Sequence, residues 1–306
     1  MFTPKVLVLL AAYNGSSWIV RQIETILNQA NVEVRLVVSD DGSSDDTRAR
    51  IALFERDSRV LILPAVSPTG AAAQNFFRLI RDTPLDEYTV VAFADQDDIW
   101  NEDKLYRACL ALQNEDAGGY SSAVTAFWED GRTKALCQHS VLTDSDFLFE
   151  GAGQGCTFVL AGTFYRRVRE FFLQNQGQTE RLHYHDWAIY ALARSWKVDW
   201  VFDPKPTMLY RQHSNNDTGA RTSLSGMNRR VSLIREGWYL EQLYAIAEIC
   251  FTASPSDPVI ARWRGLLGRP RGLARTYAIA RFCLHGGRRR LFDRGVVVGA
   301  AILGWI

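Results

Sequence analysis

An apolar run that ends in three acids lies in the first third of the 306-residue chain, at Thr89-Val90-Val91-Ala92-Phe93-Ala94-Asp95-Gln96-Asp97-Asp98. A short apolar run bounded by charge predicts a β-strand that is buried on both faces, as in a parallel sheet. Ile99 and Trp100 follow, and a helix is predicted to begin near residues 101–104. The acids are therefore expected at the carboxyl end of a buried strand.

The three acids of this cluster are Asp95, Asp97 and Asp98. Carboxylates this close repel one another, which costs free energy unless a cation or a proton offsets the charge. An oxygen-rich site suits Mg²⁺ or Mn²⁺, with water and substrate phosphates as the remaining ligands. The alternative is a solvated acidic turn that caps the next helix. The position at a strand end, beside a second acidic strand end, favours the metal site.

Strand and helix patterns alternate around this cluster. Strands are predicted at Val6–Ala12, Val34–Ser39, Val60–Leu63 and Thr89–Ala94, and helices at Ser16–Gln29, Asp45–Phe54 and Ala71–Arg81. Repeated β-α-β units predict the α/β class, with a mostly parallel, Rossmann-like sheet flanked by helices. Ligands bind such sheets at the carboxyl ends of the strands.

A second acidic cluster, Asp40-Asp41-Gly42-Ser43, ends the second predicted strand. A carboxylate here can accept a hydrogen bond from a pyrimidine N3–H or from a ribose hydroxyl. The same residues are equally compatible with a turn and a helix N-cap. The first strand is not followed by G-x-G-x-x-G, and the chain has no P-loop motif, so dinucleotide-binding and P-loop proteins lose their main support.

The pattern changes near residue 215. Short strands are expected at Ala123–Phe127, Thr157–Leu160 and Val198–Phe202, a Gly-rich loop at 151–155 and a helix at His185–Ser195. Strand patterns then stop, Ser223–Phe251 has helical periodicity, and the arginine-rich remainder is predicted to be helical. We therefore expect a catalytic domain over residues 1–215 and a helical, arginine-rich appendage over 216–306.

The segment Val259–Ile306 contains ten arginines and one acid, Asp293, and so carries a formal charge of +9. Because the whole chain carries +1, residues 1–258 carry −8. Basic amphipathic helices with aromatic anchors lie on anionic membranes, where each basic residue contributes roughly 1 kcal/mol. An anionic membrane surface is therefore favoured as the partner of the tail, ahead of a homo-oligomer contact. Nucleic acid ranks last, because no recognition motif is present.

The five cysteines are odd in number and include no C-x-x-C pair, which fits a reducing compartment and gives no thiolate metal site. The apolar start, Val6–Ala12, is predicted to be a strand rather than part of a signal peptide. No uninterrupted apolar run reaches the roughly 20 residues that a bilayer span needs. We expect a cytoplasmic chain that does not cross a membrane unaided.

Several motifs in order resemble the inverting glycosyltransferases of family 2, which have the GT-A fold. They are Ala12-Tyr13-Asn14-Gly15, Asp40-Asp41-Gly42-Ser43, Gly70 with Asn75-Phe76, and Phe93-Ala94-Asp95-Gln96-Asp97-Asp98-Ile99-Trp100. The resemblance covers roughly residues 4–215. Within the family, His185-Asp186-Trp187 and Tyr210-Arg211-Gln212-His213 look most like bacterial rhamnosyltransferases that use dTDP-L-rhamnose.

The resemblance implies a nucleotide-sugar site. Its residues would be Ala12, Tyr13, Asn14, Asp41, Asn75, Asp95, Gln96, Asp97 and Arg211. Asp41 matches the aspartate that contacts the nucleobase, and Tyr13 the residue along the base or ribose. The metal ligands implied are Asp97, Asp98 and His213, although the sequence does not divide the roles among the three acids.

Asp186 matches the catalytic base of the family, which takes the proton from the acceptor hydroxyl as its oxygen attacks the anomeric carbon. A positioned base typically contributes about 10²–10⁴-fold. The alternative is that Asp186 only caps the helix that starts near Trp187. The usual family form has an acid before this aspartate, where this chain has His185.

The acceptor side is implied to involve Gly155, Cys156 and Trp187. Glycine leaves room for a sugar or phosphate to approach the backbone. Cys156 is interpreted as a small buried residue rather than a nucleophile, because this chemistry needs no covalent intermediate. Trp187 is compatible with stacking on a sugar ring and with packing in the core.

The sequence thus predicts a metal-dependent, inverting rhamnosyltransferase of surface-polysaccharide or O-antigen synthesis. Its acceptor would be a saccharide or a polyprenyl-diphosphate-linked saccharide at the inner face of the cell membrane. One alternative keeps the fold and uses a UDP-hexose donor, because thymine and uracil present the same edge to Asp41. Another is a non-catalytic nucleotide-sugar-binding scaffold, against which the full set of acids argues. A nucleotidyltransferase is disfavoured, because the chain lacks a basic Gly-rich N-terminal loop.

Overall fold

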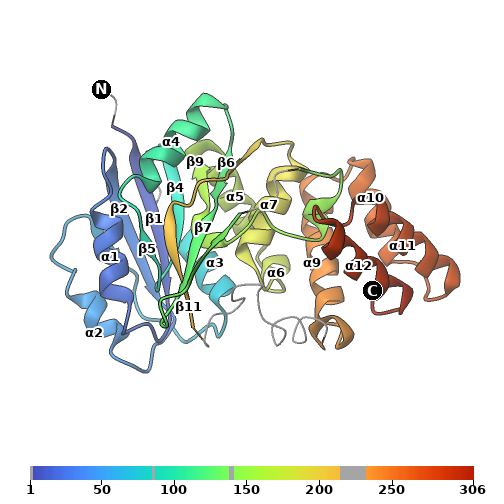
Figure 1. The fold of residues 1–306 in the computed structure, drawn as a ribbon, viewed down its shortest axis with the longest axis horizontal. Helices are drawn as coiled ribbons and strands as arrows, with labels where there is room; N and C mark the ends of the chain where they lie inside the picture. Colours follow the sequence, from blue (N-terminus) through green and yellow to red (C-terminus); the bar gives the residue numbers. More distant parts are fainter. Residues whose placement is uncertain (1–2, 85–86, 138–140, 214–231) are drawn as a thin grey trace.

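Two β-sheets organise the computed structural model, which describes residues 3–84, 87–137, 141–213 and 232–306 (Figure 1). The larger sheet has the order β10-β6-β9-β4-β1-β2-β3. Its strands are β1 (Lys5–Ala12), β2 (Glu33–Asp40), β3 (Val60–Ile62), β4 (Val90–Asp95), β6 (Gly119–Ser122), β9 (Val159–Ala161) and β10 (Trp200–Asp203). Its neighbours pair in parallel except at β9, which runs antiparallel to β4 and β6. The predicted α/β class and mostly parallel sheet are confirmed.

Helices cover both faces of this sheet, as the double burial of β1 requires. Its alternate residues belong to two separate cores, with Leu7 and Leu9 in one and Val8 and Leu10 in the other. The helices before the C-terminal region are α1 (Ile19–Leu27), α2 (Thr47–Ala52), α3 (Ala72–Asp82), α4 (Lys104–Asn114), α5 (Gly162–Gln174), α6 (Gln176–Thr179) and α7 (His185–Ser195). The 3₁₀ turns η1 (Asp146–Leu148) and η2 (Gly155–Thr157) flank the Gly-rich loop.

The register of three neighbouring strands aligns their carboxyl ends. β1 pairs with β2 up to Ala12 opposite Asp40, and with β4 up to Ala11 opposite Asp95. Both acidic clusters therefore lie at one edge of the sheet, where a parallel α/β sheet binds its ligands.

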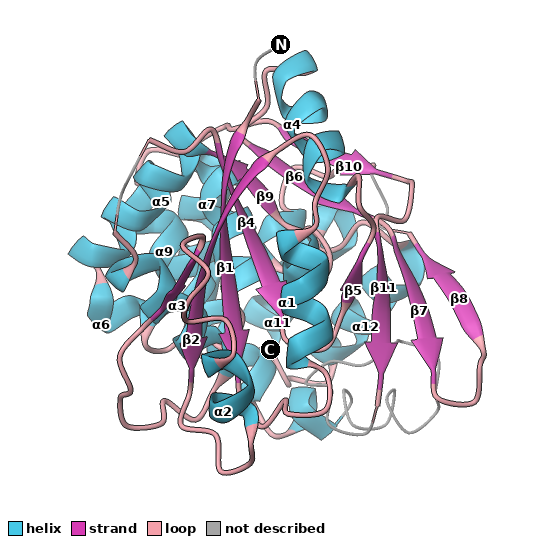
Figure 2. Ribbon diagram, turned by 90° about the vertical axis from the view of Figure 1, so that its left-hand side faces the viewer, coloured by secondary structure: helices cyan, strands magenta, loops and turns pink. Residues whose placement is uncertain are grey.

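A four-stranded sheet, not predicted from the sequence, lies beside the larger one (Figure 2). Its order is β5-β11-β7-β8, with β5 (Ile99–Trp100), β7 (Val124–Trp128), β8 (Thr133–Leu136) and β11 (Met208–Gln212). β11 pairs antiparallel with β5, Leu209 opposite Ile99, and in parallel with β7. This pairing brings residues 211–213 next to the acidic turn after β4.

The C-terminal region is helical, as predicted, in the part that the structure describes. Its helices are α9 (Trp238–Ala253), α10 (Pro258–Leu267), α11 (Leu273–Gly286) and α12 (Leu291–Ile302). The expected helix over 223–251 begins outside the described residues, as does the expected boundary at 215/216. Gly237 immediately precedes α9 and has a left-handed φ of 88°, which is not helical. The expected single helix is therefore interrupted at Gly237, and α9 begins at Trp238. Among the described residues no helix has both the length and the apolar character that a membrane crossing needs.

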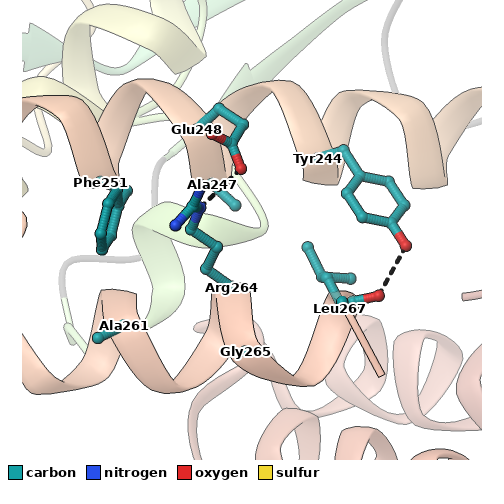
Figure 3. Close-up of a pocket in the computed structure, with 9 residues that line it drawn as sticks. Tyr244, Ala247, Glu248, Phe251, Ala261, Arg264, Gly265 and Leu267 are labelled. Atoms are coloured by element: carbon teal, nitrogen blue, oxygen red, sulfur yellow. Dashed lines mark hydrogen bonds and ion pairs between the residues drawn. The ribbon is translucent and has the colours of Figure 1, made fainter. Parts of the chain in front are cut away.

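These helices continue the main core rather than standing apart from it. Trp263 is fully buried, stacks on Phe282 with centroids 5.0 Å apart, and lies 4.7 Å from Phe149. Figure 3 shows α9 and α10 joined by the Glu248–Arg264 ion pair and by the Tyr244 hydroxyl, which donates to the carbonyl of Leu267. The small pocket between these two helices is lined by their own packing residues.

The formal charge of the tail is not all available to a partner, because several of its arginines make contacts within the fold. Arg288 donates to the carbonyl of Phe149 at 3.1 and 3.2 Å. Arg289 is buried, donates to the Glu150 carboxylate from both its backbone N (2.6 Å) and Nε (3.2 Å), and donates to the carbonyl of Gly151. Arg275 and Arg294 also make hydrogen bonds within the C-terminal helices. With Arg264, which pairs with Glu248, and Arg290, which donates to the carbonyl of Cys137 at 3.0 Å, six of the ten arginines make polar contacts within the described structure.

Replacing Arg289 by Met is expected to lower the free energy of unfolding by about 3–5 kcal/mol, because Glu150 would stay buried without its partner. Arg281 is exposed on α11, so Arg281→Met provides the matched control and should change the free energy of unfolding by less than about 0.5 kcal/mol. Urea unfolding of both variants checks this. Equal effects at the two positions would contradict the role assigned to Arg289.

The first residue of α7 is a buried histidine. His185 is 8% exposed, its ring stacks on Phe76 with centroids 3.8 Å apart, and its Nε2 has no hydrogen-bond partner within the described part of the chain. Burial lowers the pKa of His185 to about 3. The folded protein therefore holds a neutral imidazole where the unfolded chain, with an ordinary pKa near ~6.5, becomes protonated.

This difference makes stability depend on pH in one direction. Above pH ~6.5 both states are neutral; between ~6.5 and about 3 only the unfolded state takes up the proton, so stability falls as the pH falls. At pH 5 the loss due to His185 should be about 2 kcal/mol. Urea unfolding at pH 7.5 and 5 should show that His185→Phe loses this part of the pH dependence and that His285→Gln, at an exposed histidine, does not. An unchanged pH dependence in His185→Phe would refute the assignment.

Candidate active site

The loops after β1 and β4 are locked together by one glutamine. The backbone N of Tyr13 donates to Gln96 Oε1 at 2.8 Å, and Gln96 Nε2 donates to the carbonyl of Tyr13 at 2.7 Å. Gly15 makes this possible, because a Cβ there would lie 2.1 Å from Gln96 Oε1. The Tyr13 side chain is 54% exposed, so its ring is accessible above the strand ends.

The loop after β1 is also joined to the loop after β2. Asn14 takes a left-handed conformation, with φ of 48°, its backbone N donates to Ser43 Oγ at 2.8 Å, and its Oδ1 accepts from the backbone N of Ser44 at 2.8 Å. Ser43 Oγ in turn donates to Asp40 at 2.5 Å. Asn14 thus shapes the edge of the site through its backbone and its side chain.

Asp41 and Asn75 are buried beneath this edge. The Asp41 carboxylate accepts from Thr69, through its backbone N at 2.7 Å and Oγ1 at 2.9 Å, and from the backbone N of Gly70 at 3.1 Å. Asn75 Nδ2 donates to the carbonyls of Ser39 (3.0 Å) and Ala12 (3.3 Å). Both residues therefore fix the loops and strand ends around the site.

The three acids after β4 lie in different environments. Asp95 is half-buried, Asp97 is 8% exposed, and Asp98 is 1% exposed. Asp98 Oδ1 accepts from the backbone N of Arg211 at 3.4 Å, whereas its Oδ2 has no hydrogen-bond partner in the described ranges. Burial, followed by the charges of Asp97 and Asp95, raises the pKa of Asp98 well above its usual value. Asp98 is thus the acid that most readily holds a proton.

Lys104, which the sequence did not single out, lies beneath this cluster. It is fully buried at the start of α4, its Nζ lies 4.5 Å from the Trp100 ring, and Nζ has no hydrogen-bond partner among the described residues. Burial lowers the pKa of Lys104 to about 8. Cys156 and Asp98 act in the opposite direction and raise it, but by less. A lysine in the first turn of a helix is usually exposed, so no local signal marked it.

β11 adds a histidine and an arginine to the acidic turn. His213 Nε2 and Asp97 Oδ2 are 2.7 Å apart, and the imidazole stacks on Trp18, another residue that the sequence did not indicate, with centroids 4.4 Å apart and planes at 15°. Arg211 Nε donates to the carbonyl of Asp97 at 3.0 Å. The predicted grouping of Asp97, Arg211 and His213 therefore has a structural basis in the unexpected second sheet.

A thiol also adjoins the acids. Within the described residues, Asp95, Asp98 and Cys156 form a group whose potential ligand atoms all lie within 4.8 Å of one another. Cys156 is fully buried, and burial together with Asp98 and Asp95 raises its pKa well above the usual value, so it stays a neutral thiol. Mg²⁺ and Mn²⁺ prefer oxygen ligands, and a neutral thiol is a poor ligand for either. Asp95 and Asp98 therefore fit these ions better than Cys156 does. The other two predicted ligands, Asp97 and His213, form a pair with Nε2 and Oδ2 2.7 Å apart.

The Gly-rich loop connects these acids to the start of α7. A Cβ on Gly155 would lie 3.1 Å from the Cβ of Asp186 and 2.6 Å from His185 Nε2, so only glycine fits without a shift. The Sγ of the next residue, Cys156, lies within 4.8 Å of a carboxylate oxygen of Asp98. Two consecutive residues of one turn thus contact the predicted base on one side and the acidic cluster on the other.

Asp186 and Trp187 both use their side chains in the local fold. Asp186 lies in the first turn of α7, and its Oδ1 accepts from the backbone N of Trp187 at 2.7 Å. This is not the bond of a helix cap, because a capping side chain accepts from a residue two or three positions later, and the N-cap of α7 is Tyr184. Trp187 is 5% exposed, its Nε1 donates to the carbonyl of Phe147 at 2.8 Å, and its ring stacks on Tyr239. Trp187 therefore packs in the core.

Comparison with known proteins places this arrangement in a family. The family model described as "Glycosyl transferase family 2" matches residues 7–194. A protein of Shigella flexneri named "dTDP-rhamnosyl transferase RfbG" is 38% identical over 240 residues, which are 78% of this chain and 83% of the relative.

Solved structures share the fold at low identity. Staphylococcus aureus TarS, solved with UDP-GlcNAc, matches 98% of this chain and 89% of its own with a TM-score of 0.55 at 14% identity. The mannosyltransferase PcManGT of Pyrobaculum calidifontis, solved with GDP-Man and Mn²⁺, matches 99% and 87% with a TM-score of 0.51 at 16% identity. The family match and the aligned strand ends agree: the chain is a glycosyltransferase of family 2 with the GT-A fold.

Proposed function

We propose that this glycosyltransferase transfers L-rhamnose from dTDP-L-rhamnose, with inversion, to a saccharide or polyprenyl-diphosphate-linked saccharide during surface-polysaccharide synthesis. The observation that carries the proposal is the η2 turn, whose consecutive residues Gly155 and Cys156 contact Asp186 and Asp98. A base for the acceptor and an acidic site for the donor diphosphate are thereby neighbours. The rhamnosyl donor is supported by the 38% identical relative, which aligns with most of both chains.

Asp186 acts as the general base in this proposal. The acceptor hydroxyl oxygen attacks the anomeric carbon of the donor while Asp186 takes up its proton. The bond from that carbon to the diphosphate oxygen breaks on the opposite face, and the nucleoside diphosphate leaves with the electron pair. The position of Asp186 in the first turn of α7 and its bond to the N–H of Trp187 hold the carboxylate in place for this step.

The donor end is built from the strand edge. In this proposal Tyr13 would lie along the base or ribose. Asp41 would accept from the pyrimidine N3–H in exchange for bonds that it now accepts from Thr69 and Gly70. Asp97, Asp98 and His213 would hold Mg²⁺ or Mn²⁺ in this proposal, because they supply carboxylate oxygens and one imidazole. Two observations support it: Asp97 and His213 lie 2.7 Å apart, and Asp98 shares a group of potential ligand atoms with Asp95. When bound, the ion supplies Lewis acidity at the leaving diphosphate.

We place the enzyme at the cytoplasmic face of the membrane, where a polyprenyl-diphosphate acceptor would lie. The exposed arginines of the tail support a contact with anionic lipid. A homo-oligomer contact is the competing use of the same region.

A UDP-hexose donor is the second candidate. It is favoured by a relative from Escherichia coli, "UDP-Glc:alpha-D-GlcNAc-diphosphoundecaprenol beta-1,3-glucosyltransferase WfgD", which is 35% identical over 100 residues. That match covers 32% of this chain and 37% of the relative, so it carries less weight than the rhamnosyl match.

Donor and metal can be tested together by thermal unfolding with a panel of nucleotide sugars. With Mn²⁺ or Mg²⁺, dTDP-L-rhamnose at 100 times its Kd should stabilise the protein by about 2.7 kcal/mol. Asp97→Ala should lose this metal-dependent gain, and Asp130→Ala, at an exposed acid in the β7–β8 turn, should keep it. Stabilisation by a UDP-hexose instead would replace the rhamnosyl donor. No response to any nucleotide sugar would refute the proposed activity.

The role of Asp186 is tested by Asp186→Asn, whose Oδ1 can still accept from the N–H of Trp187 and so keeps this local contact. We expect kcat to fall by about 10²–10⁴-fold, because an amide cannot take up the proton. Donor affinity should stay within about twofold, and the matched control Asp199→Asn, at an exposed residue, should keep full activity.

Retained activity in Asp186→Asn would contradict the role of Asp186 as the general base. NMR of the product should show an anomeric configuration opposite to that of the donor. Retention of configuration would exclude the single displacement described above.

A further inference from the structure

Exposed apolar side chains concentrate on the last two helices. Among the described residues, fifteen large apolar side chains are exposed, and eight of them lie between Leu273 and Leu303 on α11, on α12 or directly after α12. We call six of these the outer face: Leu273, Tyr277, Leu284, Leu291, Phe292 and Leu303, which are 58–89% exposed. Scattered exposed leucines are ordinary, whereas a contiguous set of this kind marks an interaction site.

The spacing places the exposed apolar residues of α11 on one side of that helix. Leu273, Tyr277 and Leu284 recur at intervals of four and seven residues, which places them on one stripe of α11. The opposite stripe, which includes Ile279 and Phe282, is buried in the core.

α12 repeats this arrangement. It buries Val297, Ala300 and Ala301 and exposes Leu291 and Phe292 at its start. Helices that are apolar on both sides occur where both sides are covered. We therefore expect a partner to cover the exposed apolar residues of α11 and α12.

Exposed arginines surround the outer face. Arg269 and Arg271 precede α11, Arg281 lies within it, and Arg290 precedes α12. The single acid of Val259–Ile306, Asp293, is half-buried. An apolar centre with a cationic rim is complementary to a surface that is apolar inside and anionic outside, which describes the interfacial region of an anionic bilayer.

The charges disfavour the other occupants. A two-fold dimer through this face would bring the same arginines of two copies together, and like charges across an interface cost free energy. A nucleic acid would engage the arginines and leave the apolar centre exposed to water. Figure 1 shows α11 and α12 at the end of the molecule opposite α1 and α2. Docking by this end would hold most of the acidic body, residues 1–258, away from an anionic surface.

We propose that the outer face of α11 and α12 inserts into the interfacial region of an anionic lipid bilayer, with the exposed arginines at the headgroups. This inference refines the membrane placement proposed above and rests on it for the kind of partner. It differs in what makes the contact: apolar side chains insert, and Arg288 and Arg289 are excluded because they hold the Gly-rich loop.

The test is sedimentation of the full chain with vesicles of phosphatidylglycerol and phosphatidylcholine, compared with phosphatidylcholine alone. The wild type should bind the anionic vesicles. The triple variant Leu273→Gln, Tyr277→Gln, Phe292→Gln should bind at least about tenfold more weakly, because the apolar insertion is lost. Its three sites are highly exposed, so the fold should persist, as circular dichroism and urea unfolding can verify. The matched control Leu53→Gln, Leu110→Gln, Leu173→Gln removes exposed leucines elsewhere and should bind as the wild type does.

Single replacements of exposed arginines separate their contribution to lipid binding from that of the apolar side chains. Each of Arg269→Gln, Arg271→Gln and Arg281→Gln should weaken binding to anionic vesicles roughly fivefold. Arg48→Gln, Arg50→Gln and Arg56→Gln remove exposed arginines from the body and should leave binding unchanged.

Three outcomes would overturn the proposal. They are a wild type that does not bind anionic vesicles, an outer-face triple variant that binds them normally, and a dimer in sedimentation velocity that this variant dissociates without any change in lipid binding. Donor-induced stabilisation, measured on the same variants in the absence of lipid, reports on the proposed function separately. If the donor does not stabilise the wild type, the proposed function is refuted, and the conclusion about lipid binding is unaffected.

Discussion

Repulsion among Asp95, Asp97 and Asp98 is the constraint on which the site depends, because three carboxylates follow one buried strand within four residues. The protein offsets this charge from several directions. Lys104 lies beneath the turn, the backbone N–H of Arg211 reaches Asp98, and His213 meets Asp97. Two of these groups come from β11 and its end, so the second sheet serves to bring cationic and donor groups to the acids. The acids of this site suit a divalent cation, and the basic and donor groups beside them suit an anionic diphosphate.

Hydrogen bonds between side chains and backbone join the loops around the three acids. Gln96 ties the turn after β4 to the loop after β1, and Asn14 ties that loop to the one after β2. Asn75 spans the ends of β1 and β2 from below. The polar side chains predicted to bind the donor therefore also join three loops into one platform. This double use explains why short polar residues, rather than long flexible ones, occupy these positions.

The sequence was informative where a pattern is local. The apolar runs of β1, β2 and β4 and the acids that follow them predicted the sheet and the edge at which the site lies, because periodicity and strand ends are properties of adjacent residues. β11 was missed because it has only five residues, whose alternation of buried and half-buried positions is too short to stand out beside Pro204 and Pro206. Lys104 was missed because its burial is decided by the acids and the Trp100 ring packed around it. Nothing local distinguishes Arg289, which is buried, from Arg290, which is exposed, so the tail looked uniformly basic.

The bond between Arg289 and Glu150 joins residues 139 positions apart in the chain. Synthesis proceeds from the N-terminus, so the Gly-rich loop leaves the ribosome long before its counter-charge has been made. Until then Glu150 has no hydrogen bond from Arg289, Asp146 lacks the charge of Arg289 at 3.7 Å, and the loop that contacts Asp186 lacks part of its support. The sheet can form early from neighbouring strands, whereas the acceptor side of the site has to wait for the C-terminal helices. The order of synthesis would thus delay the appearance of a competent enzyme until the helices proposed to meet the membrane are themselves in place.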